Sequence, residues 1–288
     1  MRSYSPSSSP SEREIPLNDT VLQYVLAAIL VLPLLGAAVA LLPAPPGLRG
    51  RGPEQAVLRH GVTVTGAVLV LAIVLAAGFD HDHPAKMQAT TDLSWIPALD
   101  IHLHLGIDGI SLPLLVLTAL LTFLCAIYAY FRPAEAQSGN GKGGPKAYVA
   151  LLLLLESGTL ASFAVLDLIL FFLAFEMVLI PMYFLIARWG SGAHPPAHHH
   201  PSEEALRAEN FAARSALRFI VYTLLGSVIM LLGLLLIGVK AGTFDMVALA
   251  TDNGSSLSHS TQLIAVLAIG LGLAVKAPMW PLHSWLPD

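Results

Sequence analysis

Hydrophobic residues gather into seven long runs along the chain, and stretches rich in Pro, Gly, Ser or charge separate them. A helix needs about 20 apolar residues to cross the hydrocarbon core of a bilayer, which is about 30 Å thick. Each run meets or approaches that length, so the pattern predicts seven membrane-spanning helices. Their expected bounds are Val21–Leu42, Gly61–Phe79, Ile110–Phe131, Ala147–Leu166, Leu168–Ala187, Leu217–Val239 and Thr261–Val275.

The fourth and fifth runs almost merge at "AVLDLIL". Together they extend from Ala147 to Ala187, which is too long for one crossing, so the chain must turn near Asp167. A carboxylate at the start of a helix accepts hydrogen bonds from backbone N–H groups. We therefore expect Asp167 to be the N-cap of the fifth helix.

The segments between the runs differ in positive charge. Ten of the 15 Lys and Arg residues lie in the loops after the first, third and fifth runs, and four lie in the segments on the other side. Positive charge marks cytoplasmic loops. The predicted topology therefore has residues 1–20 as a disordered outer tail, residues 79–109 as an outer loop and residues 188–214 as a cytoplasmic loop.

The expected outer loop contains a strand pattern. Residues 99–107 alternate between apolar and polar side chains, as a half-buried strand does. Gly106 and Gly109 are candidates for turns, and a short outer hairpin is expected. The predicted fold class is accordingly an all-α integral membrane protein, with residues 21–288 forming a polytopic helix bundle.

Composition agrees with a protein whose solvent is the bilayer. Hydrophobic residues make up 55% of the chain, charged residues only 12%, and the mean hydropathy is +0.70, whereas soluble domains carry about 25% charged residues. The net charge of -4 gives no support to a nucleic-acid partner. Cys125 stands alone, which excludes a disulfide framework or a multi-cysteine metal site. No Gly-rich nucleotide loop or catalytic triad is present, so no redox cofactor is expected in this chain.

Three ionisable residues fall inside or next to apolar runs: Glu156, Glu176 and Lys276. Each costs at least about 2.5–3.5 kcal/mol at the centre of a membrane helix, so mutual pairing or a function must offset that cost. A glutamate and a lysine that can approach or separate form a proton-binding switch. The alternatives are a structural ion pair for Glu176, a structural hydrogen bond for Glu156 and an interfacial position for the Lys276 ammonium.

The last run ends unusually, in "AVKAPMWPLHSWLPD". Pro278 and Pro281 cannot continue a helix undisturbed, so the seventh helix is expected to break after Lys276 and to restart around His283 to Pro287. Broken helices at membrane depth line wet cavities or ion sites. His283 then either relays protons or hydrogen-bonds to the unwound backbone.

Other histidines suggest metal binding less well. The segment "AHPPAHHHP", with histidines within residues 194–200, has no Cys partner, and compositional drift explains it better than a zinc site. His102 and His104 share one face of the expected strand, but no third ligand is evident.

The stretches "FFLAFEMVLIPMYFLIARWG" and "AVKAPMWPLHSWLPD" resemble motifs of the antiporter-like membrane subunits of respiratory complex I. The first is similar to F-W-E-x-x-L-I-P-M-Y-x-L-I-x-x-W-G, and the second to K-x-P-x-x-P-x-H-x-W-L-P-D-A-H without the final Ala-His. "LESGTLASFAVLDLILFF", "LRFIVYTLLGSVIML" and "LGIDGISLPLLVLT" are also similar, so the resemblance covers roughly Trp95 to Asp288. "IPMY" after the glutamate favours the chain M (chain 4) branch of NADH-quinone oxidoreductase.

The resemblance implies a function. Glu176 and Lys276 match the family's helix 5 glutamate and broken-helix lysine, the pair that modulates proton uptake. The family fold has about fourteen helices, so this chain is expected to be an N-terminal piece that does not pump protons alone. The expected partners are other membrane subunits of complex I and the lipid bilayer. NADH, FMN, iron–sulfur clusters and quinone are expected in partner subunits, in the inner membrane of a bacterium or an equivalent membrane.

Other functions remain open at this point. An Mrp-type cation/proton antiporter shares both motifs, and a membrane-bound hydrogenase or related dehydrogenase has a similar membrane arm. A structural fragment without transport activity is the simplest alternative. "FEMVLIPMYFLIARWG" favours the proton-translocating subunit of an NADH:quinone oxidoreductase.

Overall fold

The computed structural model describes residues 17–42, 53–97, 100–132, 144–190, 203–252, 255, 257–283 and 285–286 of the 288-residue chain. The His-rich segment 194–200 and residues 1–16 of the expected outer tail lie outside the described residues.

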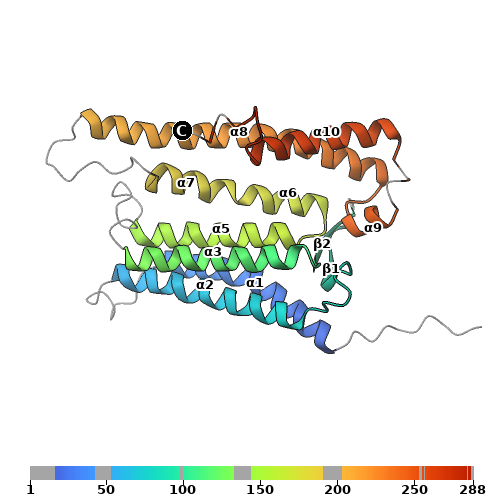
Figure 1. Cartoon of the computed structure of the whole chain (residues 1–288), viewed down its shortest axis with the longest axis horizontal. Helices are drawn as coiled ribbons and strands as arrows, with labels where there is room; N and C mark the ends of the chain where they lie inside the picture. The colour runs from blue at the N-terminus through green and yellow to red at the C-terminus, as the bar shows by residue number, and fades with distance from the viewer. Residues whose placement is uncertain are drawn as a thin grey trace, which may run out of the picture.

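Helices run back and forth in layers (Figure 1). Within the described ranges they make seven spans that are long and apolar enough to cross a membrane, as expected. The helices are α1 Leu17–Leu41, α2 Pro53–Gly78, α3 Ser111–Phe131, α5 Gly144–Ala164, α6 Leu168–Met177, α7 Leu179–Trp189, α8 Glu203–Ala241 and α10 His259–Lys276. Six of the spans are single helices, and the fifth consists of two shorter helices, α6 and α7.

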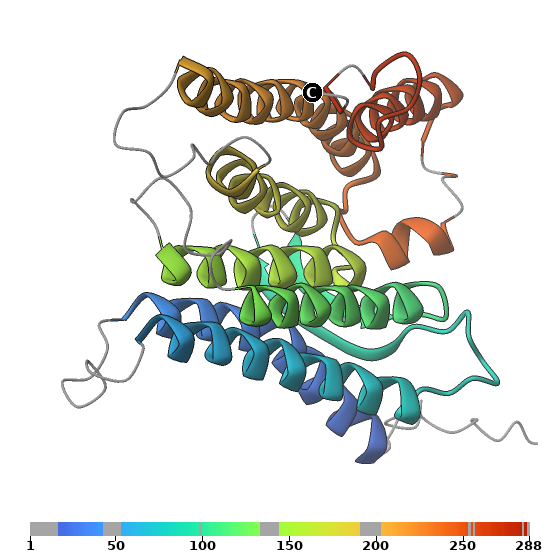
Figure 2. The same cartoon turned by 60° about the vertical axis from the view of Figure 1, so that its left-hand side comes forward.

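The layers follow the order of the chain. Figure 2 shows α1 and α2 on one side, α3 and α5 next to them, then α6 and α7, and finally α8 with α10. The largest buried cluster joins α1, α2, α3 and α5 around fully buried side chains such as Leu26, Leu75 and Leu115. A smaller cluster around Met230 joins α6 to α8 and α10.

Large apolar side chains also cover the outside of the bundle. Leu35, Val70, Leu121, Leu225 and Leu267 are each more than half exposed. So wide an apolar surface would drive a soluble protein to aggregate, whereas lipid tails are as apolar as leucine. The chain is a multi-pass integral membrane protein.

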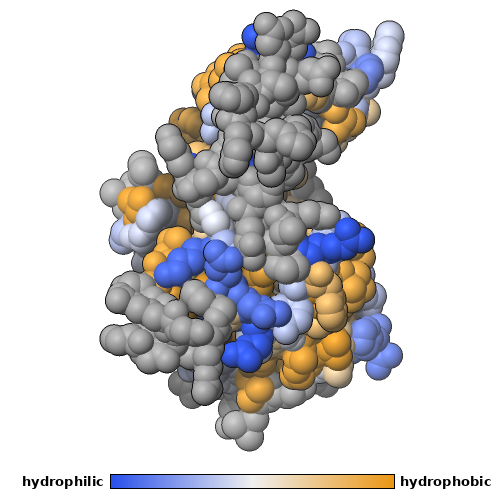
Figure 3. Space-filling view, turned by 90° about the vertical axis from the view of Figure 1, so that its left-hand side faces the viewer, coloured by the Kyte–Doolittle hydropathy of each residue, from blue (hydrophilic) through white to orange (hydrophobic). Residues whose placement is uncertain are grey.

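The two ends of the bundle differ. The hairpin end carries a two-stranded sheet and the short helix α9, Met246–Thr251. The basic end, where α1, α3 and α7 finish and α5 begins, carries Arg132, Lys146 and Arg188. Figure 3 looks onto the basic end and shows hydrophilic side chains between apolar ones.

The helices begin earlier than the apolar runs suggest. The helix α1 starts at Leu17, so the expected tail 1–20 is too long by four residues. The helix α8 starts at Glu203 instead of Leu217, which makes the expected loop 188–214 helical from residue 203 onward. The added sequence, "EEALRAENFAARSA", is rich in strong helix formers, and helix propensity extends the helix beyond its apolar part.

The fifth crossing is interrupted, which the sequence analysis did not predict. The helix α6 ends at Met177 and α7 begins at Leu179, with Val178 between them. Pro181 explains the interruption, because it has no N–H group to donate to the Met177 carbonyl and its ring crowds that carbonyl.

The expected hairpin is present, with strands β1 Gln88–Ile96 and β2 Ile101–Ile107 paired antiparallel. Between the strands, Asp100 N donates a hydrogen bond to Pro97 O at 3.4 Å. Gly106 is therefore not a turn residue: it lies in β2, where a Cβ atom would meet the side chain of Leu166 at 2.8 Å. Gly109 lies in the turn that leads into α3.

Asp167 joins the hairpin to the helices. Its Oδ1 accepts hydrogen bonds from Ile169 N and Leu170 N at the start of α6, so the predicted N-cap is confirmed. Its Oδ2 accepts a hydrogen bond from His102 N at 3.3 Å. The side chain is fully buried, and a single carboxylate thus fixes both the helix start and the strand.

Candidate functional site

Glu176 and Lys276 form an ion pair within the membrane-spanning part of the bundle. Lys276 Nζ lies 3.2 Å from Glu176 Oε1, and both side chains are 16% exposed. Glu176 belongs to the last turn of α6, and Lys276 is the last residue of α10. Two charges placed in the bilayer by separate helices therefore compensate each other.

Phe175 contributes two further contacts to Lys276. The Phe175 carbonyl accepts a hydrogen bond from Nζ at 2.8 Å, and the ammonium lies 3.4 Å from the centroid of the Phe175 ring. The last four carbonyls of a helix have no regular partner within it. Because Pro181 ends α6 at Met177, the interruption makes the Phe175 carbonyl available to the lysine.

Close packing of α8 on α10 holds the lysine-bearing helix. A Cβ atom at Gly272 would lie 2.5 Å from the Gly226 carbonyl oxygen, and one at Gly226 would lie 2.8 Å from Val275 Cβ. Small residues permit such an approach of membrane helices. The two glycines therefore position the end of α10, with Lys276, beside α8.

The chain after Lys276 leaves the helical path. Residues 277–283 and 285–286 form turns, with Pro278 and Pro281 among them, and the expected helix restart around His283 is absent from these described residues. Trp285 Nε1 donates a hydrogen bond to Val275 O at 3.0 Å, and its ring packs against Phe219 of α8. The turn segment thus folds back over the end of α10.

His283 lies in this turn segment. Its Nδ1 is buried and has no hydrogen-bond partner among the described residues, while its carbonyl accepts a hydrogen bond from Leu286 N. No hydrogen bond or ion pair among the described residues links the His283 side chain to Glu176 or Lys276.

Glu156 occupies a separate place in α5 and is fully buried. Thr122 of α3 donates a hydrogen bond to Glu156 Oε1 at 2.7 Å, and Glu156 Oε2 has no partner among the described residues. No hydrogen bond or ion pair in those ranges links Glu156 to Glu176 or Lys276. The structure therefore pairs two of the four proton candidates, and no hydrogen bond or ion pair among the described residues joins Glu156 or His283 to them.

The histidines of the hairpin pair with carboxylates and do not share a site. His102 Nδ1 lies 2.7 Å from Asp92 Oδ1, and His104 Nδ1 lies 2.9 Å from Asp245 Oδ2. The hydrogen bond with Asp92, more than its charge, raises the pKa of His102 above its usual value. Asp245 is also the N-cap of α9, so His104 ties the hairpin to the linker between α8 and α10.

Sequence reasoning missed two contributors to the ion-pair site and one partner of Glu156. At the site, Phe175 contacts Lys276 through its carbonyl and its ring, and Pro181 interrupts the helix beside Glu176. Thr122 donates a hydrogen bond to Glu156. The signal for Pro181 was present, because a proline five residues after a membrane glutamate must free a carbonyl. Phe175 and Thr122 carried no local signal, because their roles depend on which helices pack together.

Comparison with known proteins agrees with this architecture. Residues 204–288 match the family described as NADH:quinone oxidoreductase/Mrp antiporter, TM. NADH-quinone oxidoreductase subunit M of Rhodobacter capsulatus is 34% identical over 279 residues, covering 93% of this chain and 48% of that protein. The chain spans about half the length of the curated relatives it matches.

Solved structures give the same result. A chain of respiratory complex I from Thermus thermophilus superposes with a TM-score of 0.66 at 26% identity, over 91% of this chain and 46% of that one. A chain of the Mrp complex from Dietzia shares the fold, with a TM-score of 0.66 at 23% identity, over 94% and 43% of the two chains. The seven-crossing bundle, the family match over residues 204–288 and these relatives agree: the chain corresponds to about half of an antiporter-like membrane subunit such as subunit M (chain 4) of NADH-quinone oxidoreductase.

Proposed function

We propose that this chain takes part in proton translocation in the membrane arm of an NADH:quinone oxidoreductase. The observation that carries the proposal is the Glu176–Lys276 ion pair, 3.2 Å long and located in two membrane-spanning segments. An ammonium group beside a carboxylate disfavours protonation of that carboxylate. Separation of the pair would therefore favour proton uptake by Glu176, and its re-formation would favour release.

The broken helix ends support such a movement. Lys276 ends α10, Glu176 lies one residue from the end of α6, and proline-containing turns follow or interrupt both helices. Helix interruptions give transporters ion-binding backbone and mobile segments. His283, in the turn after α10, is the further proton-carrying group in this proposal, whereas Glu156, in α5, acts as a neutral, hydrogen-bonded group beside Thr122.

The wider setting is part of the same proposal. Redox chemistry takes place in partner subunits that hold NADH, FMN, iron–sulfur clusters and quinone, and this chain holds no redox cofactor. The basic end faces the cytoplasm of a bacterium and the N-terminus faces outside, following the excess of Lys and Arg in the loops of that end.

The decisive experiment uses the assembled complex in membrane vesicles. Glu176→Gln and Lys276→Met each leave one charge uncompensated, and we expect proton translocation to fall about tenfold, equivalent to about 1.4 kcal/mol of lost interaction. Glu54→Gln and Lys240→Met are matched controls, because both positions are exposed. The measurements are NADH-driven acidification, quinone reductase activity and native gels that report assembly. Wild-type pumping by both variants would refute the role of the pair.

An Mrp-type antiporter is the second candidate, favoured by the fold shared with the Dietzia complex. The two functions predict different partners and drivers. Affinity purification in mild detergent should recover flavin and iron–sulfur subunits in the first case and small membrane antiporter subunits in the second. Cation-driven proton exchange without NADH, in the same vesicles, would favour the antiporter.

A further inference from the structure

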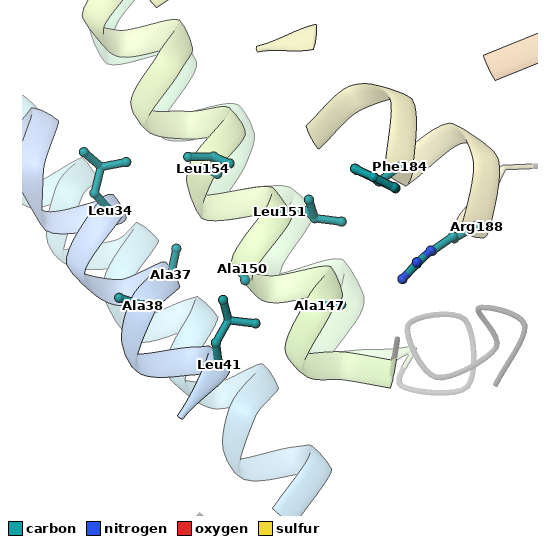
Figure 4. Close-up of a pocket in the computed structure, with 10 residues that line it drawn as sticks. All are labelled: Leu34, Ala37, Ala38, Leu41, Ala147, Ala150, Leu151, Leu154, Phe184 and Arg188. Atoms are coloured by element: carbon teal, nitrogen blue, oxygen red, sulfur yellow. The ribbon is translucent and has the colours of Figure 1, made fainter. Parts of the chain in front are cut away.

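A groove opens on the outer surface of the bundle between α1, α5 and α7 (Figure 4). Its volume is about 410 Å³, within the range of about 300–1,000 Å³ that small-molecule sites occupy. Leu34 and Leu41 of α1 and Phe184 of α7 line it and are between 37% and 61% exposed. The groove therefore opens toward the lipid phase.

The depth of the groove can be measured along its two main walls. On α1 the lining extends from Leu41 to Leu34, and on α5 from Ala147 to Leu154. Seven residues of helix span about 10 Å, which is about a third of the hydrocarbon thickness. The walls consist of alanine and leucine, so the groove suits a hydrocarbon chain that enters from one membrane surface.

Two cations lie at the end of the groove near Leu41 and Ala147, called its open end below: Arg188, which lines the groove, and Lys146, which precedes Ala147. Figure 4 shows the Arg188 side chain extending from α7 toward the Ala147 end of α5, and its guanidinium lies 5.4 Å from the centroid of the Phe184 ring. Lys146 lies in the first turn of α5 and donates a hydrogen bond to Leu42 O, at the end of α1. An ammonium carries three N–H donors, so Lys146 has donors beyond the one that holds α1.

The start of α5 adds to this positive field. The N-terminus of a helix favours anions through its unpaired N–H groups and its dipole, and α5 begins at Gly144, beside the two cations. No acidic side chain lines the groove in the described part of the chain. The open end of the groove is thus complementary to a phosphate, while its interior is complementary to an alkyl chain.

We propose that the groove binds one anionic phospholipid, with an acyl chain between α1 and α5 and the phosphodiester at Arg188 and Lys146. A membrane helix fits less well, because a helix is about 10–12 Å in diameter and must cross about 30 Å, whereas the groove covers a third of that depth. Phosphate binds an arginine through two parallel hydrogen bonds. The site is separate from Glu176 and Lys276 and does not depend on proton translocation.

The test is lipid titration of the purified, delipidated protein followed by native mass spectrometry. We expect one phosphatidylglycerol to bind about tenfold more tightly than phosphatidylcholine, and Arg188→Gln to remove that preference. Ala38→Phe, which fills the groove from α1, should weaken both lipids, and Leu154→Phe is a second filling variant in case the first does not fold.

Matched controls lie at other surfaces of the same bundle. Arg132→Gln removes a cation from the end of α3, and Ala67→Phe adds a ring on the exposed face of α2; neither change should affect the lipid. Equal affinity for both lipids, or equal losses in Arg132→Gln and Arg188→Gln, would overturn the proposal. Disulfide formation between a cysteine in place of Ala38 and another subunit, with no lipid co-purified, would also overturn the proposal. A protein segment would then occupy the groove.

Discussion

The membrane glutamates Glu176 and Glu156 differ in the groups that offset the cost of burying a carboxylate. Glu176 has the ammonium of Lys276 at 3.2 Å, whereas fully buried Glu156 has one hydroxyl donor, Thr122, and an oxygen without a partner among the described residues. An unpaired buried charge is far more costly than a neutral polar group with a hydrogen bond. A neutral, hydrogen-bonded carboxyl group is therefore the state that the surroundings of Glu156 support.

Replacing the buried carboxyl group by an amide, in Glu156→Gln, tests this assignment. An amide keeps the oxygen that accepts from Thr122 and carries no charge, so we expect proton translocation close to wild type and stability within about 1 kcal/mol. The proton translocation rate of Lys276→Met, measured in the same vesicles, is the reference for a severe loss. A loss in Glu156→Gln as large as in Lys276→Met would mean that ionisation of Glu156 is essential.

A few polar contacts of the hairpin position the helices that hold Glu176 and Lys276. Asp167 fixes the start of α6 and holds β2 through His102 N, while Asp245 starts α9 and pairs with His104. These two aspartates lie opposite each other in an isolated antiparallel bridge. The hairpin thus connects the α5–α6 turn with the α8–α9 linker, and so constrains both helices that lead to the ion pair.

The hairpin is predicted to be more stable at low pH. The hydrogen bond with Asp92 raises the pKa of His102, and Asp100 lies 3.5 Å from the other ring nitrogen. A group whose pKa is raised by folding stabilises fully below its unfolded pKa of about 6.5 and loses that effect as pH rises through the folded value. His102→Gln should therefore lower the unfolding temperature more at about pH 5.5 than at about pH 8.5. An equal or opposite difference in thermal unfolding would contradict this assignment.

The whole molecule is polarised between its two ends. Arg132 and Arg188 lie at the ends of α3 and α7, and Lys146 at the start of α5, all at the basic end. The hairpin end holds the carboxylates of Asp167 and Asp245. Positive segments stay on the cytoplasmic side during insertion. The same polarity supplies the cations of the proposed lipid site, so the predicted orientation and the proposed lipid site depend on the same basic residues.

The predicted orientation can be tested by labelling single cysteines in intact cells. In a Cys125→Ser background, a cysteine in place of Lys86 should react with an impermeant maleimide from outside. A cysteine in place of His198, in the segment between α7 and α8, should react only after the membrane is opened. Labelling of position 198 from outside would reverse the topology.

Much of the architecture was determined by the sequence alone. Seven apolar runs predicted seven crossings, "AVLDLIL" predicted the turn and cap at Asp167, and alternation in residues 99–107 predicted the hairpin. These features are local, because bilayer thickness sets helix length and a cap needs only the next turn of backbone. Where propensity outweighed hydropathy, as at the start of α8, the apolar run gave the wrong boundary.

Tertiary structure decided which groups meet. Glu176 and Lys276 are both exceptional in sequence, yet only the close packing of α8 on α10 and the interruption of α6 bring them within 3.2 Å. The two contacts of Phe175 with Lys276, the isolation of Glu156 and the groove between α1, α5 and α7 have no local signature. The reason is physical: composition and period fix how each helix meets the bilayer, whereas contacts between helices depend on close packing of side chains distant in sequence.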